Sequence, residues 1–234
     1  MDIVFLGPPG SGKGTQAQRL AEAIVVPWCS TGAILRRAVA EKTPTGRKAK
    51  SIMDAGNLVP DDILAELVRE ALARPESRNG VVFDGYPRNE AQAETLDGLL
   101  AEAGRRVDFA VLVDVPEDVI IARLSGRRSC PKDGSVYHLE SARPSHAGKC
   151  DRCGTALVMR DDDRPETIQA RMAVYHAQTA GLPKRYEAAG VLFRVDGAHG
   201  SRDAIFQKIR EAAGVASRAA AARKKAAGPP AGAP

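Results

Sequence analysis

Short runs of consecutive apolar residues alternate along the chain with longer segments in which apolar residues recur every three or four positions. Strands that are buried on both faces of a sheet have this continuous apolar character. We expect such strands at residues 3–6, 25–29, 81–84, 109–115 and 191–195. Strands that alternate with helices predict an α/β fold in three layers, with a central parallel sheet of five strands.

The segments between these runs carry helical patterns. Residues 61–73 place five apolar side chains on one face, namely Ile63, Leu64, Leu67, Val68 and Leu72. Pro60 and Asp61 are start signals for this helix, and Pro116 opens another that runs through Leu124. A third helical run covers residues 16–23, directly after the first strand.

Two stretches break the alternation. Residues 30–59 are typical of a small helical insertion, whereas residues 126–163 are rich in Gly, Pro, Ser and Cys and have no long periodic segment. The second stretch is too long for an ordinary loop, so we expect a functional lid. The predicted core domain therefore comprises residues 1–29, 60–125 and 164–213.

Composition supports one domain with insertions. The chain has 234 residues, of which 44% are hydrophobic and 27% charged, as in globular proteins. Most of the formal net charge of +5 comes from a low-complexity Ala/Gly/Pro tail, residues 214–234, which holds Arg218, Arg223, Lys224 and Lys225. We expect this basic tail to be disordered, although it could instead be a weak anchor for nucleic acid or an anionic surface.

The sequence begins MDIVFLG, which resembles neither a signal peptide nor a transit sequence. No apolar run approaches the roughly 18 residues of a membrane span. We therefore expect a cytoplasmic protein that does not enter a membrane. In that reducing compartment the four cysteines favour metal or redox chemistry over structural disulfides.

A glycine-rich loop follows the first strand and precedes a helix. It reads GPPGSGKGT over residues 7–15, and this context is the one that a phosphate-binding P-loop requires. Glycines allow backbone N–H groups to converge on phosphate oxygens at the start of the helix. We predict nucleotide binding, with ATP contacts from Gly10, Ser11, Gly12, Lys13, Gly14 and Thr15.

The order of motifs resembles that of adenylate kinases over residues 1 to about 213. After the loop come STG at residues 30–32 with Arg36, GNLV at 56–59, DGYPR at 84–88 with Gln92, GRR at 126–128 and VYH at 136–138. The resemblance implies reversible phosphoryl transfer from ATP to AMP, giving two ADP. It also implies that residues 30–59 form the monophosphate-binding insertion and residues 126–163 the lid.

The resemblance assigns candidate roles. It implies ATP contacts at Arg123, Arg127, Val136, Tyr137 and His199. It implies AMP contacts at Thr31, Arg36, Asn57, Leu58, Val59, Gly85, Tyr86, Pro87, Arg88, Gln92, Arg160 and Arg171. The implied catalytic set is Lys13, Asp84, Arg88, Arg127, Arg160 and Arg171.

These residue types suit phosphoryl transfer. Arginine pairs bidentately with phosphate and stays charged, and the AMP phosphate oxygen attacks directly without a nucleophilic side chain. Asp84 ends a strand at the edge where ligands bind, so it is a candidate for orienting Mg²⁺ through water. The alternative is a helix-capping or turn aspartate.

Two C-x-x-C-like knuckles lie within residues 126–163. Cys130 and Asp133 form the first, and Cys150 and Cys153 the second, which is zinc-ribbon spacing with one cysteine replaced. We predict a structural Zn²⁺ site made of these four residues, as the resemblance also implies. Alternatives are a redox-active cysteine pair, unliganded cysteines, or His138 or His146 as the fourth ligand. Cys29 is expected to be a small core residue.

Five residues allow alternative interpretations. Ala33 stands where the family usually has aspartate, which could weaken capping or AMP-side hydrogen bonding, and His199 stands where relatives commonly carry Gln or Lys. Asp161, Asp162 and Asp163 either orient arginines at a lid hinge or form a solvated charge run.

Other functions compete with this hypothesis. Within the same class, the donor could be GTP or the acceptor another monophosphate, although Thr31 and Gln92 favour adenine. In a different class, a P-loop switch or a zinc-ribbon nucleic-acid binder would suit the basic tail. The knuckles lack a basic and aromatic face, so we do not expect nucleic acid as a partner. The default expectation is a monomer.

Overall fold

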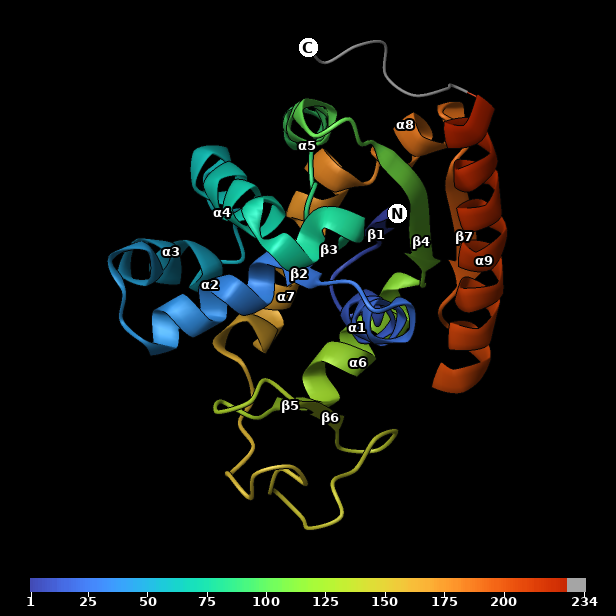
Figure 1. Cartoon of the computed structure of the whole chain (residues 1–234). Helices are drawn as coiled ribbons and strands as arrows, with labels where there is room; N and C mark the ends of the chain where they lie inside the picture. The colour runs from blue at the N-terminus through green and yellow to red at the C-terminus, as the bar shows by residue number, and fades with distance from the viewer. Residues whose placement is uncertain (227–234) are drawn as a thin grey trace.

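Figure 1 shows the computed structural model, which describes the backbone of residues 1–226 and the side chains of residues 1–221. Five parallel strands form one sheet in the order β2-β3-β1-β4-β7. Their bounds are Asp2–Leu6 (β1), Trp28–Ser30 (β2), Val82–Asp84 (β3), Val107–Asp114 (β4) and Leu192–Asp196 (β7). The predicted α/β fold with a central parallel five-stranded sheet is confirmed.

The apolar side chains of the central strands divide between two hydrophobic clusters. Along β1, Val4 and Leu6 belong to one cluster and Ile3 and Phe5 to the other, and all four are at most 2% exposed. Helices α4 (Asp61–Ala73) and α5 (Glu90–Glu102) contribute to the first cluster. Helices α1 (Lys13–Ile24), α6 (Glu117–Gly126) and α9 (Arg202–Ala226) contribute to the second. Burial on both faces explains the continuous apolar runs.

The strand register brings the carboxyl ends of the strands to one edge. Phe5 in β1 pairs with Asp84 in β3, and Ser30 in β2 pairs with the same aspartate. The connection between β1 and α1 begins at this edge, where α/β sheets bind ligands. The fold thus places the predicted P-loop and Asp84 side by side.

The remaining elements surround that edge. Helices α2 (Thr31–Ala40) and α3 (Pro44–Asp54) occupy the segment 30–59, and Figure 1 shows them extending to one side of the sheet. Strands β5 (Arg127–Ser129) and β6 (Val136–His138) form a separate antiparallel pair within 126–163. The chain returns through η2 (Asp161–Asp163), α7 (Pro165–Val174), η3 (Tyr175–Thr179) and α8 (Pro183–Ala188), and η1 (Pro75–Asn79) precedes β3.

The second strand is shorter than predicted. It begins at Trp28, whereas Val25 ends α1 with a φ of 56° and is 86% exposed. The two valines before Pro27 extend the apolar run, but they form the turn between α1 and β2. Prediction of a strand over 25–29 was therefore wrong at its start.

The tail prediction also needs correction. Helix α9 continues to Ala226, so residues 214–226 are helical and not disordered. Alanine has the highest helix propensity, and Ala213 and Ala220 are at most 8% exposed, which explains why the helix continues. Residues 227–234 lie outside the described part of the chain. Among the helices of residues 1–226, none combines the length and apolarity needed to cross a membrane.

Candidate active site

The glycine-rich loop curls back on itself before α1. Gly7, Gly10 and Gly12 have φ values of 136°, 83° and 91°, which residues with a Cβ rarely adopt. The Lys13 ammonium donates to the Pro8 carbonyl over 3.0 Å. Burial lowers the pKa of Lys13 to about 7, opposed by Asp84 and assisted by Arg88 and Arg171. Because an opposite charge favours the protonated form, a bound phosphate would reverse that shift.

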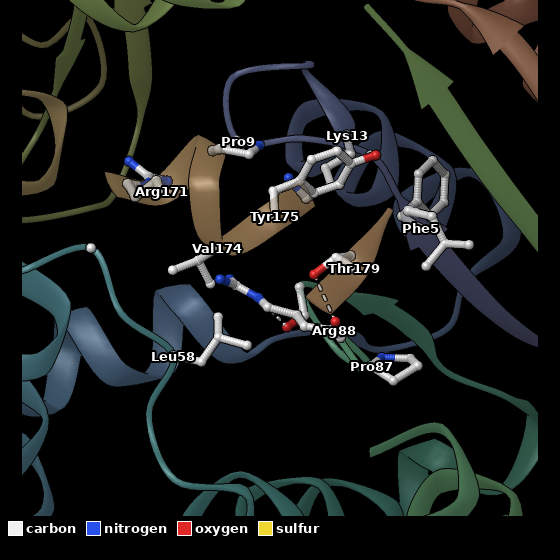
Figure 2. Close-up of a pocket in the computed structure, with 14 residues that line it drawn as sticks. Phe5, Pro9, Lys13, Leu58, Pro87, Arg88, Arg171, Val174, Tyr175 and Thr179 are labelled. Carbon is white, nitrogen blue, oxygen red and sulfur yellow. Dashed lines mark hydrogen bonds between the residues drawn. The ribbon is translucent and has the colours of Figure 1, made fainter. Parts of the chain in front are cut away.

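One pocket joins the residues predicted for the two nucleotides (Figure 2). Pro9 and Lys13 reach it from the loop, and Leu58, Pro87 and Arg88 reach it from the segments predicted to bind AMP. Gly85, Arg171, Tyr175 and Thr179 also line it. The structure therefore brings three cationic side chains from distant segments into a single cavity.

Arg36 and Arg88, which are predicted to hold AMP, lack acidic hydrogen-bond partners. Arg88 donates from Nε to the Gly85 carbonyl over 2.9 Å, and its own carbonyl accepts from the Thr179 hydroxyl. Within residues 1–221, no carboxylate forms a hydrogen bond or ion pair with Arg36 or Arg88. Burial and Arg171 lower the pKa of Arg88 to about 10, and burial also lowers the pKa of Arg36. Two half-buried guanidinium groups without a carboxylate partner favour a bound anion, as a phosphate would be.

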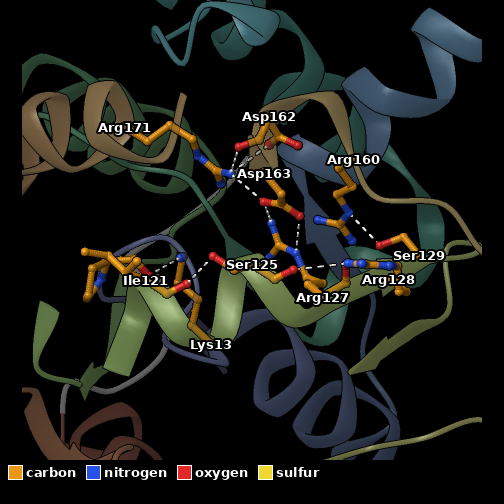
Figure 3. A network of polar contacts seen from close by, with 11 residues as sticks. Lys13, Ile121, Ser125, Arg127, Arg128, Ser129, Arg160, Asp162, Asp163 and Arg171 are labelled. Carbon is orange, nitrogen blue, oxygen red and sulfur yellow. Dashed lines mark hydrogen bonds and ion pairs between the residues drawn. The ribbon is translucent and has the colours of Figure 1, made fainter. Parts of the chain in front are cut away.

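Two aspartates instead hold Arg127 and Arg171 (Figure 3). Arg127 forms two hydrogen bonds with the Asp163 carboxylate, whose side chain is 0% exposed. Arg171 lies 3.1 Å from the same carboxylate and 3.0 Å from Asp162. Arg160 donates to the Ser129 hydroxyl over 2.7 Å. Of the two interpretations for 161–163, the orienting role fits Asp162 and Asp163, while Asp161 is 62% exposed.

Asp84 lies against the glycine-rich loop. A Cβ at Gly14 would lie 3.0 Å from the Asp84 Oδ2 atom, so the loop backbone passes directly beside this carboxylate. The Ser30 hydroxyl donates to Oδ2 over 2.9 Å. Asp84 is not a helix cap, because Asn89 caps α5. Its carboxylate is therefore placed beside the predicted phosphate site, as a Mg²⁺-orienting group requires.

Sequence reasoning missed the role of Ser30. Its hydroxyl also accepts from the Ala33 N–H at 3.4 Å and so caps α2. The helix is capped without an aspartate at position 33. The contact with Asp84 arises from the pairing of β2 with β3, which has no signal in the local sequence.

Most of the other residues predicted to bind AMP are buried or half-buried, whereas Asn57 is exposed. Thr31 donates its hydroxyl to the Gly85 carbonyl over 2.9 Å, Val59 and Tyr86 belong to the core, and Leu58 lines the pocket. Asn57 connects to α3 through its backbone N–H. Gln92 is 1% exposed. Its amide oxygen accepts from the Arg88 backbone N–H, and its amide nitrogen donates to the Asp61 carboxylate.

The other residues predicted to bind ATP are spread more widely. Arg123 lies 3.5 Å from the carbonyls of both Ser11 and Ala198, next to the loop. The His199 side chain is 86% exposed and lies 2.8 Å from Asp196, whose pKa this contact lowers to about 2. Val136 and Tyr137 are in β6 and do not line the pocket of Figure 2. The Tyr137 hydroxyl accepts from the Asp151 N–H.

Four potential metal ligands converge at the far end of β5 and β6. One donor atom from each of Cys130, Asp133, Cys150 and Cys153 lies within 4.8 Å of the other three. Sulfurs bound tetrahedrally to zinc lie about 3.8 Å apart, so this spacing fits. His138 and His146 lie outside the group, and the His138 ring packs against Gly126. No disulfide joins Cys150 and Cys153.

This fold and this pocket define a P-loop phosphotransferase, with arginines from several segments gathered around a site for polyanions. A family model described as adenylate kinase matches residues 5–191. An adenylate kinase of Anaeromyxobacter sp. (strain Fw109-5) is 50% identical over 84% of this chain and 92% of its own length. Those of Archaeoglobus fulgidus and Syntrophobacter fumaroxidans are 44% and 47% identical over 90% and 89% of this chain, with 100% and 98% of their own lengths covered. The chain belongs to the adenylate kinase family.

Proposed function

We propose that the chain catalyses reversible transfer of the γ-phosphoryl group from ATP to AMP, giving two ADP. The single pocket lined by Lys13, Arg88 and Arg171 carries this proposal. It joins the phosphate-binding loop to Arg88, which has no acidic partner among the described residues, and to Arg171, so two polyanions can meet there. The family membership supports the same reaction.

The chemistry needs positioning and charge more than it needs a reactive side chain. An oxygen of the AMP phosphate attacks the γ-phosphorus of ATP, and the bond from that phosphorus to the β–γ bridging oxygen breaks, so ADP leaves as a second ADP forms. We propose that loop N–H groups, Lys13 and Arg123 hold ATP, and that Arg36 and Arg88 hold the AMP phosphate. Arg127, Arg160 and Arg171 then surround the transferring group.

The metal that accompanies ATP fits beside Asp84. When bound, Mg²⁺ neutralises charge on the β- and γ-phosphates. We propose that Asp84 orients it, because this carboxylate lies against Gly14 and is held by Ser30. Thr15 offers its hydroxyl from the first turn of α1.

The bases are assigned to opposite sides of the transfer site. For AMP we propose Thr31, Gly85, Tyr86, Pro87, Gln92 and the segment Asn57, Leu58 and Val59. For ATP we propose Val136, Tyr137 and His199. Val136 and Tyr137 belong to residues 126–163, which we propose close as a lid about Gly126 and residues 161–163. Closure excludes water, which would otherwise hydrolyse ATP.

We propose that the lid carries one structural zinc ion held by Cys130, Asp133, Cys150 and Cys153. The donor set and the spacing support it. Residues 126–163 contain only short strands and a few isolated backbone bridges, so a bound metal would stabilise the fold of this segment.

Because one four-ligand site binds one ion, purified protein should hold about one zinc per chain. Removal of the zinc by a chelator should lower the melting temperature of the protein. Metal content by mass spectrometry and a melting curve check both. Cys150→Ala should lose the metal, whereas Cys29→Ala, which removes a buried cysteine outside the cluster, should keep it. Metal-free protein with an unchanged melt would refute the site.

The reaction itself is tested by incubating the protein with ADP and Mg²⁺. We expect ATP and AMP to appear in equal amounts. In the forward direction, ATP with AMP should react faster than GTP with AMP or ATP with other monophosphates. ATP hydrolysis without phosphorylation of AMP would overturn the proposal. We further propose a cytoplasmic monomer, which is supported by the unpaired cysteines and by a site built from one chain.

A further inference from the structure

Gln92 is fixed at both ends of its amide. Its Nε2 atom donates to the Asp61 carboxylate over 2.6 Å, and its Oε1 atom accepts from the Arg88 backbone N–H over 2.7 Å. The Asn89 amide nitrogen lies 3.3 Å from the second oxygen of Asp61. These contacts join the first turns of α4 and α5 beside the pocket residue Arg88.

The chemistry of the two partners allows only one amide orientation. A carboxylate accepts hydrogen bonds and does not donate, whereas a backbone N–H donates and does not accept. A rotation of the Gln92 amide by 180° would set Oε1 against Asp61 and the NH₂ group against the Arg88 N–H. Both hydrogen bonds would become repulsive contacts, so the oxygen and nitrogen ends are fixed.

The fixed amide keeps half of its hydrogen-bonding capacity. After these two contacts, one N–H and one oxygen lone pair remain. Adenine presents an exocyclic amine donor beside a ring-nitrogen acceptor, whereas guanine presents a carbonyl acceptor beside a ring N–H donor. Distinguishing the two requires that the amide oxygen and nitrogen do not exchange places.

We propose that Asp61 is a specificity-determining positioning residue, which locks the Gln92 amide in the orientation that suits adenine and opposes guanine. This rests on the proposed function, in which Gln92 faces the acceptor base. Asp61 acts on Gln92 and does not itself contact the nucleotide. A polar site that fixes its donors and acceptors rejects a mismatched base because groups are then left unpaired.

The test compares AMP with GMP as acceptor for Asp61→Asn. Asparagine can turn either its oxygen or its NH₂ group toward Gln92, so both amide orientations become tolerable. We expect the ratio of kcat/KM for AMP to that for GMP to fall about tenfold, mainly because KM for GMP falls. Adenine stays preferred, because the Arg88 N–H still favours the original orientation. Asp62→Asn, the neighbouring acid in the same helical turn, is the matched control and should keep the ratio.

Three outcomes separate this inference from the proposed function. Wild-type protein that does not phosphorylate AMP would contradict the proposed function and, with it, the proposed role of Asp61. If Gln92→Ala lowers the AMP:GMP ratio but Asp61→Asn leaves it unchanged, the proposed role of Asp61 alone would be overturned. An equal fall in Asp61→Asn and Asp62→Asn would show an effect of charge only and would also overturn it. If the asparagine variant is poorly folded, Asp61→Ala replaces it in the test. This variant removes the acceptor without offering a donor, and it should lower the AMP:GMP ratio in the same direction.

Discussion

The Arg88→Ala variant is expected to lose about 10³-fold in kcat/KM for AMP, by analogy with the loss of an arginine that contacts a transferring phosphoryl group. Arg88 is half-buried, lacks a carboxylate partner among the described residues, and lines the same pocket as Lys13 and Arg171. Alanine would leave the AMP phosphate without a charge to hold it in line with ATP. Steady-state kinetics with varied AMP at saturating ATP measures the loss.

Arg69→Ala is the matched control for this variant. Arg69 is also an arginine, but its side chain is 56% exposed and pairs with Glu66 on the surface of α4. Such exposed ion pairs contribute little to stability, so the activity of Arg69→Ala should be near that of wild type. Near-normal AMP phosphorylation by Arg88→Ala would contradict the role assigned to this arginine.

The Asp163→Asn variant is expected to lose both stability and turnover. Asp163 lies between Arg127 and Arg171 with a side chain that is 0% exposed. Asparagine would leave the Arg127 guanidinium without its carboxylate and Arg171 with Asp162 alone. Removing one partner of a buried pair costs about 3 kcal/mol. Misplaced arginines should also lower kcat by about 10²-fold. Chemical unfolding and single-turnover kinetics measure the two effects.

The control for this variant lies two residues earlier. Asp161 is 62% exposed and lies 3.5 Å from Arg164, so Asp161→Asn removes the same charge from the same turn without disturbing the buried network. It should unfold and turn over almost as wild type does. If the two asparagine variants behaved alike, the buried network would not be what positions Arg127 and Arg171.

Much of the fold could be predicted because burial on both faces leaves a visible pattern. The runs that contain Ile3, Phe83 and Val111 are continuous in sequence because their side chains fill two cores. Helix α4 was predicted with its observed bounds, since its start signals and its apolar spacing agree. The predicted strand began too early, at Val25, because an apolar run does not distinguish a strand from the turn before it.

The site was predictable where function constrains short motifs. The glycine-rich loop has its own local signature, and the order of the other motifs pointed to Arg36, Arg88 and Arg171. The structure then showed which arginines have acidic partners, which no motif encodes. The contacts of Ser30 with Asp84 and of Asp61 with Gln92 join segments 54 and 31 residues apart. Such pairs depend on strand register and helix packing, so a local pattern cannot reveal them.

The central claim is that ATP and AMP occupy one pocket together, end to end. It is tested most directly by calorimetric titration of AMP into protein saturated with Mg²⁺ and a non-hydrolysable ATP analogue. We expect a single class of AMP site that Arg88→Ala removes and Arg69→Ala keeps. If the analogue binds but AMP does not bind alongside it, or if AMP merely displaces the analogue, the claim is wrong.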